Sequence, residues 1–124
     1  MANTKQKSIT IDGVEYVPKG TENTKAKPLK GMKYCIVRTY SAGVFAGYVE
    51  SRKGQEVVMR NARRLWYWKG AASLSQLAME GSSCPSECKF PTAVDTVELL
   101  NAIEILDCTQ KAQDSIISTP IWQQ

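Results

Sequence analysis

Short runs of alternating apolar and polar residues dominate the chain from about residue 32 onward. Residues 34–40 and 44–50 alternate around a three-residue loop, and Gly43 fits the left-handed position that ends such a loop. A later segment, residues 56–68, is rich in β-branched and aromatic residues, with Asn61 as a candidate bulge or break. Together these segments predict a β-meander.

Two short helices are predicted in the second half. Ser73-Leu-Ser-Gln76 fits a capping box with Gly81 as the stop, and residues 109–117 fit a closing helix that Pro120 cannot continue. Between them, residues 96–108 predict a strand, although a helix also fits the spacing of their apolar residues. The expected fold class is α+β, a mainly antiparallel, meander or sandwich-like sheet with one short helix after the Trp-rich strand and one near the C-terminus.

The chain begins with a segment of different character. Ile9 to Val17 alternates apolar and polar residues around Asp12-Gly13, which is a strong hairpin signal. We expect a β-hairpin extension over residues 1–18, a flexible linker over 19–31 and a single α+β domain over 32–124. An isolated two-stranded hairpin is only marginally stable in water, so we expect it to dock on the domain or to pair with another chain.

Composition and charge narrow the class of protein. The chain has 124 residues, 43% of them hydrophobic, and no apolar run approaches the roughly 20 residues of a membrane-spanning helix. Without a signal-peptide hydrophobic region, we expect a cytoplasmic protein. Residues 32–69 carry eight basic and two acidic residues, whereas residues 70–124 carry two and seven. This asymmetry predicts a positive face for an anionic partner and, with the lone hairpin, favours a homo-oligomer.

Residues 60–73 concentrate the candidate chemistry, because guanidinium groups bind phosphate, aromatic rings stack on bases and a helix start attracts anions. In an uninterrupted strand the even-numbered residues from Arg60 to Trp68 would share one face, and a bulge at Asn61 would shift the arginines relative to the tryptophans. The competing interpretation is that the tryptophans are core residues. The expected ligand-binding residues are Arg60, Arg63, Arg64, Trp66, Trp68, Gly70, Ala71 and Ser73, with Arg38 and Tyr40 from the first strand of the meander.

Other chemistry has little support. The chain has no histidine, the usual general base and a common metal ligand, so we expect no enzymatic activity, no metal and no cofactor. A zinc site at Cys84 and Cys88 would need two further ligands, while Cys35 and Cys108 belong to predicted strands at opposite ends of the core. Four acidic residues are spaced like solvent-facing strand positions: Asp95, Glu98, Glu104 and Asp107.

Three stretches resemble a family of small tailed-phage and prophage proteins of uncharacterised function. They are Lys33-Tyr-Cys-Ile-Val-Arg-Thr-Tyr-Ser-Ala-Gly-Val-Phe-Ala-Gly-Tyr48, Asn61-Ala-Arg-Arg-Leu-Trp-Tyr-Trp68 and Gly70-Ala-Ala-Ser-Leu-Ser-Gln-Leu-Ala78. The N-terminal Ile-Asp-Gly-Val-Glu-Tyr-Val-Pro resembles the opening of various small phage proteins. The resemblance implies a phage gene product made in the host cytoplasm, and it brings no established activity.

Three functions remain open. The first, which we favour, is a non-enzymatic binding protein that captures a nucleotide-like, phosphate-bearing small molecule, by analogy of context with phage proteins that sequester nucleotide signals of host defence. The second is single-stranded nucleic-acid binding through the basic and aromatic residues, which the acidic C-terminal half opposes. The third is an interaction or structural protein whose Trp-rich strand is core or subunit interface.

Overall fold

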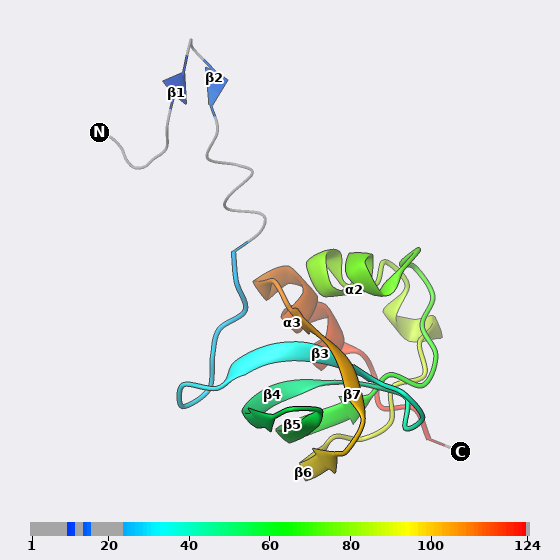
Figure 1. Ribbon diagram of the computed structural model, residues 1–124. Coiled ribbons are helices and arrows are strands. Elements are labelled where there is room, and N and C mark those ends of the chain that lie inside the picture. The colour runs from blue at the N-terminus through cyan, green and yellow to red at the C-terminus, as the bar shows by residue number, and fades with distance from the viewer. Residues whose placement is uncertain (1–9, 12–13, 16–23, 124) are drawn as a thin grey trace.

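The computed structural model describes residues 10–11, 14–15 and 24–123 (Figure 1). In this part of the chain, none of the helices has the length and apolar character to cross a membrane. The balance of strands and helices confirms the predicted α+β class, and a five-stranded antiparallel sheet is its main element. In chain order the elements are β1 (Thr10–Ile11), β2 (Val14–Glu15), β3 (Lys33–Thr39), β4 (Val44–Lys53), β5 (Glu56–Arg64), α2 (Leu74–Glu80), a 3-10 helix (Pro85–Glu87), β6 (Val94–Leu99), β7 (Ala102–Asp107) and α3 (Gln110–Ser118).

The sheet has the strand order β6-β5-β4-β3-β7. Strands β3 to β5 form the predicted meander, β6 extends it beside β5, and β7 returns to the opposite edge to pair with β3. Only Leu100 and Asn101 separate β6 from β7, so the two edge strands meet at one end and the sheet curls (Figure 1). Residues 96–108 are therefore mostly a hairpin, and the alternative prediction of a helix there is wrong.

Each face of the curled sheet holds its own apolar cluster, because successive strand residues point to opposite sides. Ile36 of β3 packs on the outer side, whereas its neighbour Val37 packs on the inner side. Helices α2 and α3 lie side by side over the outer face and bury Leu77 and Ile116 (Figure 1). The inner cluster contains Val37, Phe45, Val57, Met59, Ala62, Leu99 and Ala102.

The bulge predicted at Asn61 is present in β5. Asn61 has a left-handed φ of 50°, and the pairing register between β4 and β5 shifts around Gly47. The extra residue reverses the alternation, so that Met59 and Ala62 both contribute to the inner cluster. Residues before and after the bulge thus exchange faces, as the sequence predicts for such a break.

Strand β5 ends at Arg64, although the sequence predicts a strand as far as Trp68. Leu65 still donates its N–H to the carbonyl of Val44 at 2.7 Å, and the chain then leaves the sheet. Tyr67 forms only an isolated bridge with Lys89. The predicted strand is therefore too long, and residues 65–68 do not follow the alternation of the sheet.

Both helices begin where the sequence predicts, with Ser73 and Thr109 as N-caps. Thr109 is only 4% exposed, and its hydroxyl has two partners. It accepts the N–H of Ala112 at 3.1 Å and donates to the carbonyl of Met79 at 2.7 Å. One side chain therefore both starts α3 and ties it to α2.

Replacing Thr109 by alanine should lower the free energy of unfolding by about 1–2 kcal/mol, because an N-cap is lost and the Met79 carbonyl loses a donor. Urea denaturation followed by circular dichroism measures the change. Thr109→Ser keeps both hydrogen bonds and is the matched control, for which we expect a much smaller loss. Equal losses in the two variants would show that the methyl group of Thr109, and not its hydroxyl, stabilises the helix.

Residues 24–31 are attached to the domain, in contrast to the predicted linker. Ala26 donates its N–H to the carbonyl of Cys108 at 3.0 Å and packs against the outer cluster. The rest of the predicted linker, residues 19–23, lies outside the described residues. Strands β1 and β2 pair antiparallel as predicted, while the turn residues Asp12 and Gly13 are also outside the described part.

Ion pairs on the surface connect the basic and acidic halves of the sequence. The pairs Lys33–Asp107 at 3.5 Å, Arg38–Glu104 at 2.9 Å and Lys69–Glu87 at 3.1 Å each join a base from residues 32–69 to an acid from residues 70–124. The fold thus brings these opposite charges together. At these positions the uneven charge along the chain does not become one positive and one negative face. All four acidic residues predicted to face solvent are exposed.

Candidate functional site

A groove of about 370 Å³ lies where the chain leaves β5. One wall is the loop of residues 41–44 between β3 and β4, and the other wall is formed by Arg64, Leu65, Trp66 and Trp68. The volume falls within the range of small-molecule sites, roughly 300–1,000 Å³. The groove therefore brings together an arginine and both tryptophans among the predicted ligand-binding residues.

Arg64 supplies a cation to this groove. Its guanidinium carbon lies 4.5 Å from the centroid of the Phe45 ring, and β-pairing places these two residues opposite each other. Within the described part of the chain, Arg64 is the one arginine whose guanidinium makes no hydrogen bond and no ion pair. Stacking on Phe45 uses a face of the guanidinium and leaves its N–H edge available for a carboxylate or phosphate.

Trp66 supplies an aromatic surface. It is 64% exposed, so the competing interpretation of a core tryptophan is wrong for this residue. An indole ring that stays in water beside a groove offers a face for stacking. Trp68 is half-buried and packs against the outer cluster, so it both lines the groove and belongs partly to the core.

Arg63 does not line this groove, although the sequence predicts it as a ligand-binding residue, and its guanidinium is bonded to the backbone instead. It is 6% exposed, and burial lowers the pKa of its guanidinium. Because it lies on the opposite face of β5 from Arg64, it reaches the segment before β6, the last turns of α3 and the chain that follows α3. Its N–H groups all donate to backbone carbonyls, at 2.6–3.3 Å, on Phe90, Pro91, Ile116, Thr119 and Pro120.

Three other predicted residues lie outside the groove. Arg60 precedes the bulge, so it points to the face opposite the groove arginine, and it pairs with Glu50 at 3.1 Å. Arg38 pairs with Glu104 at 2.9 Å. Tyr40 is 80% exposed and precedes the loop of the groove in sequence, but it does not line the groove.

The predicted phosphate end at Gly70, Ala71 and Ser73 also lies outside the groove. Gly70 packs against the following loop, where an added Cβ would lie 2.7 Å from the nitrogen of Cys84. Ala71 packs against the outer cluster. The Ser73 hydroxyl accepts the N–H of Gln76 at 3.1 Å, so the helix start caps itself. The small residues of this corner allow close packing, and we assign them no ligand.

The cysteines do not add a reactive site to the groove. Burial raises the pKa of the Cys35 thiol to about 12, with a further contribution from its hydrogen bond to Asp107, and burial raises that of Cys108 to about 12. Both thiols therefore stay protonated at neutral pH. Among the residues that the structure describes, no group of three or more cysteines or carboxylates is placed to hold a metal ion.

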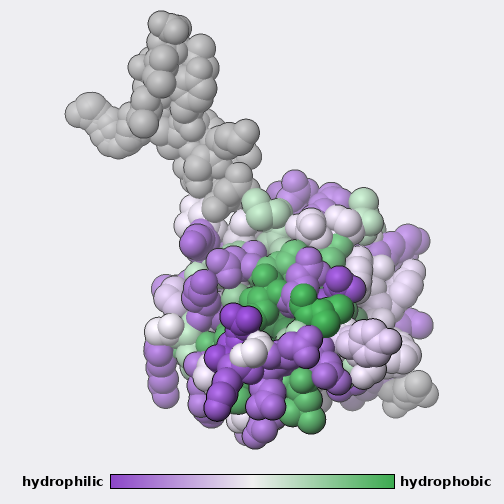
Figure 2. All heavy atoms as spheres, viewed as in Figure 1, coloured by the Kyte–Doolittle hydropathy of each residue, from purple (hydrophilic) through white to green (hydrophobic). Residues whose placement is uncertain are grey.

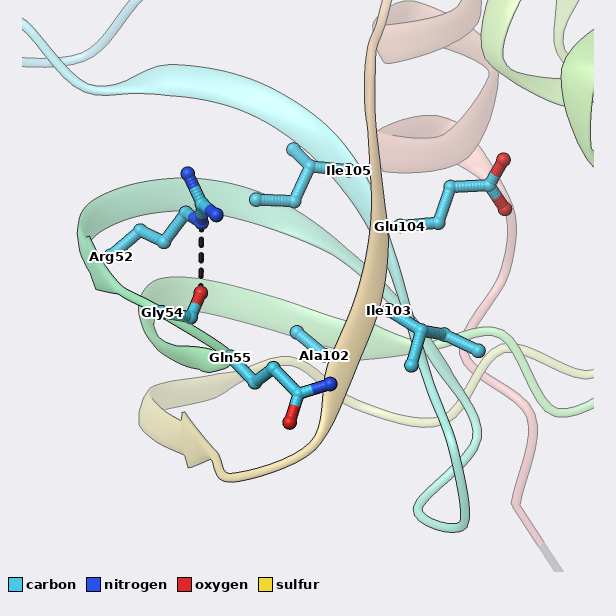
Figure 3. A pocket seen from close by; sticks show the side chains of 7 residues that line it. All are labelled: Arg52, Gly54, Gln55, Ala102, Ile103, Glu104 and Ile105. Atoms are coloured by element: carbon cyan, nitrogen blue, oxygen red, sulfur yellow. Dashed lines mark hydrogen bonds between the residues drawn. The ribbon is translucent and has the colours of Figure 1, made fainter.

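A hollow of about 530 Å³ opens between the turn after β4 and strand β7 (Figure 3). Ile103 and Ile105 of β7 face it and are 43% and 37% exposed. Across from them, Arg52 donates to the carbonyl of Gly54 at 2.9 Å, the dashed line in Figure 3. Figure 2 shows apolar side chains along β7 within a mostly hydrophilic surface. This hollow has no aromatic ring, so it does not offer the stacking chemistry of the groove.

The sequence reasoning did not foresee the role of the loop at residues 41–44 or of Phe45. A usable signal was the hairpin turn after β4, because counting the pairs back from Lys53 and Glu56 brings Phe45 opposite Arg64. Two register shifts occur between β4 and β5, but they are of opposite sense and cancel before this pair is reached. Local propensity does not show on which face of the sheet each residue lies after the bulge.

Residues 32–116 match a family described as a domain of unknown function (DUF6948). The chain belongs to this family. The matched region begins at the predicted domain start and includes the whole groove and most of α3. No curated protein and no solved structure matches the chain.

Proposed function

We propose that this protein is a non-enzymatic binding protein that captures a nucleotide-like, phosphate-bearing small molecule in the groove of Arg64, Trp66 and Trp68. One observation carries the proposal. An arginine whose guanidinium makes no hydrogen bond or ion pair among the described residues and a tryptophan that is 64% exposed line the same groove. A ligand that carries a base and a phosphate needs both an exposed ring and an available guanidinium. The stability of the fold does not require either group to be exposed to solvent.

In this proposal the base stacks on the indole of Trp66, and the phosphate meets the N–H edge of Arg64. Phe45 holds the guanidinium by stacking, so less conformational freedom is lost when the anion binds. The loop at residues 41–44 closes the other side of the groove. Stacking tolerates any base, so contacts at the edge of the base must provide the specificity.

The biological setting belongs to the proposal as well. The resemblance to small phage proteins supports a phage-encoded protein in the host cytoplasm that sequesters a nucleotide signal of host defence. The lone N-terminal hairpin supports a homo-oligomer, because two strands need a further packing surface.

A thermal-shift panel of nucleotides, cyclic nucleotides and ADP-ribose derivatives, beside a single-stranded oligonucleotide, tests the proposal. A ligand at a hundred times its dissociation constant should stabilise the protein by about 2.7 kcal/mol. For any ligand found, calorimetry should show weaker binding in Arg64→Ala and in Trp66→Ala. We expect a loss of about ten- to hundredfold in each, because an arginine hydrogen bond and a stacked base each contribute about 1–3 kcal/mol.

Arg60→Ala is the matched control, because it removes an exposed arginine of the same strand outside the groove. Its binding should equal that of the unmodified protein, and all three variants should keep the melting temperature within a few degrees. If Arg64→Ala binds every ligand as tightly as Arg60→Ala does, the groove is not the binding site.

A second candidate function is binding of single-stranded nucleic acid, and one observation favours it. Two further aromatic residues that neighbour the groove residues in sequence are exposed, Tyr40 at 80% and Tyr67 at 47%. A chain of bases could use such rings, whereas one small ligand could not. The oligonucleotide arm separates the two functions, because nucleic-acid affinity should fall steeply with added salt in proportion to the phosphates contacted.

A further inference from the structure

A separate pocket of about 340 Å³ lies on the helix side of the sheet, between β3 to β5 and the chain that follows α3. Its floor includes Tyr34 and Arg63, and its apolar rim includes Ile117 and Ile121. These two isoleucines are 54% and 55% exposed. The pocket therefore combines a polar floor with an apolar rim, as small-molecule sites do.

Tyr34 is a buried polar residue in this floor. The residue is 3% exposed, yet its hydroxyl makes no hydrogen bond with any residue that the structure describes. Its ring meets the ring of Tyr48 edge-on, with centroids 5.1 Å apart. The Tyr48 hydroxyl accepts a hydrogen bond from Gln113 at 3.2 Å, so the two tyrosines differ in this respect. Buried hydroxyl groups normally have a partner, and Tyr34 can find one in a molecule that fills the pocket.

Arg63 gives the same floor a positive charge. Its N–H groups donate hydrogen bonds to backbone carbonyl oxygens, but no carboxylate within the described chain forms an ion pair with it. Burial raises the pKa of Tyr34 above its ordinary value, and the charge of Arg63 acts in the opposite direction. The Tyr34 hydroxyl therefore lies within the field of Arg63. A negative group placed beside this hydroxyl would be stabilised by the same field.

Asn61 lines the pocket from the bulge of β5. It holds a left-handed φ of 50°, and its side-chain amide makes no hydrogen bond among the described residues. Asparagine adopts this conformation more readily than other non-glycine residues, so the bulge accounts for it. The amide gives the pocket a second polar group that a ligand can reach.

We propose that this pocket binds a small organic acid, with its apolar body against Ile117 and Ile121 and its carboxylate accepting a hydrogen bond from the Tyr34 hydroxyl. The proposal is independent of the groove at Arg64, because the two sites share no lining residue. Arg63 contributes charge to the acid without donating a hydrogen bond to it.

Phenylacetate is a suitable probe, and phenylacetamide is its neutral counterpart of nearly the same shape. Titration of the labelled protein with each compound, followed by NMR, should show shifts around this pocket with phenylacetate at millimolar concentration. Phenylacetamide should bind at least about tenfold more weakly. Tyr34→Phe keeps the ring but removes the hydroxyl, so it should weaken phenylacetate binding by about tenfold or more.

The melting temperature of Tyr34→Phe distinguishes a ligand group from a structural one. Removal of a buried hydroxyl without a partner should leave the melting temperature unchanged or raised, and Tyr48→Phe, which loses the bond from Gln113, should lower it. Ala93→Trp is a second variant that fills the pocket from its edge, and it should abolish the shifts. Arg64→Ala should bind phenylacetate normally, so this test does not depend on the groove.

The proposal is overturned if phenylacetate causes no shifts around the pocket, if phenylacetamide binds equally well, or if Tyr34→Phe lowers the melting temperature as much as Tyr48→Phe does. Unchanged phenylacetate binding in Ala93→Trp would also overturn it, because the molecule would then bind elsewhere.

Discussion

Arg63→Met should lower the free energy of unfolding by about 3–5 kcal/mol, a large part of the 5–15 kcal/mol that keeps a typical domain folded. The variant keeps the apolar stem of the side chain and removes its hydrogen bonds to carbonyl oxygens. Two of these oxygens, on Phe90 and Ile116, retain a second donor. Those of Pro91, Thr119 and Pro120 lose the donor that Arg63 supplies, which costs about 1–3 kcal/mol for each group that remains buried.

Urea denaturation of Arg63→Met, Arg63→Lys and Arg60→Met measures this effect. Arg63→Lys keeps the charge but not the planar fork, so an intermediate loss is expected. Arg60→Met removes an exposed pair with Glu50 and should cost no more than about 1 kcal/mol. If Arg63→Met were as stable as Arg60→Met, the buried guanidinium would not be what holds the chain after α3 to the sheet.

Gly47→Ala should destabilise the domain by about 3 kcal/mol or more, because the bulge leaves no space for a side chain. A Cβ at this position would lie 2.7 Å from the Cα of Ala62 and 3.0 Å from the carbonyl oxygens of Arg60 and Asn61. All three contacts are with backbone atoms, which cannot move away as the end of a side chain can. Relief would require β4 and β5 to separate at the bulge that sets the faces of Arg63 and Arg64.

Gly54→Ala is the matched control in the turn between β4 and β5. A Cβ there meets open space, so only the left-handed φ of 62° opposes it, at about 1–2 kcal/mol. Thermal and urea unfolding of the two variants should give clearly different losses. A Gly47→Ala protein as stable as Gly54→Ala would mean that the bulge can move without disrupting the sheet.

Much of the fold follows from local sequence signals. The alternation before residue 60 gives β3, β4 and the start of β5, and Asn61 marks the bulge. Ser73 and Thr109 begin the two helices, because their hydroxyls accept helical N–H groups as capping residues do. Each of these signals acts over a few residues, so it can be recognised without knowledge of the tertiary fold.

The candidate site is only partly contained in such signals. The sequence by itself determined that arginines and tryptophans would lie close together at the end of β5, because they are neighbours along the chain. It could not determine which arginine is free. Arg63 and Arg64 are adjacent and chemically identical, and the bulge decides which of them faces which side.

Tertiary contacts decided the rest. Arg63 is a structural residue because backbone carbonyls of residues 90–91 and 116–120 converge on its guanidinium. The Arg64 guanidinium lies over the Phe45 ring, which accepts no conventional hydrogen bond, so its N–H groups remain available to a ligand. The groove needs the loop at residues 41–44, which folds back from more than twenty positions away. Such contacts join segments far apart in sequence, and their register depends on how the sheet curls. A local sequence pattern therefore determines the strands and helices, but not which side chains remain available to a ligand.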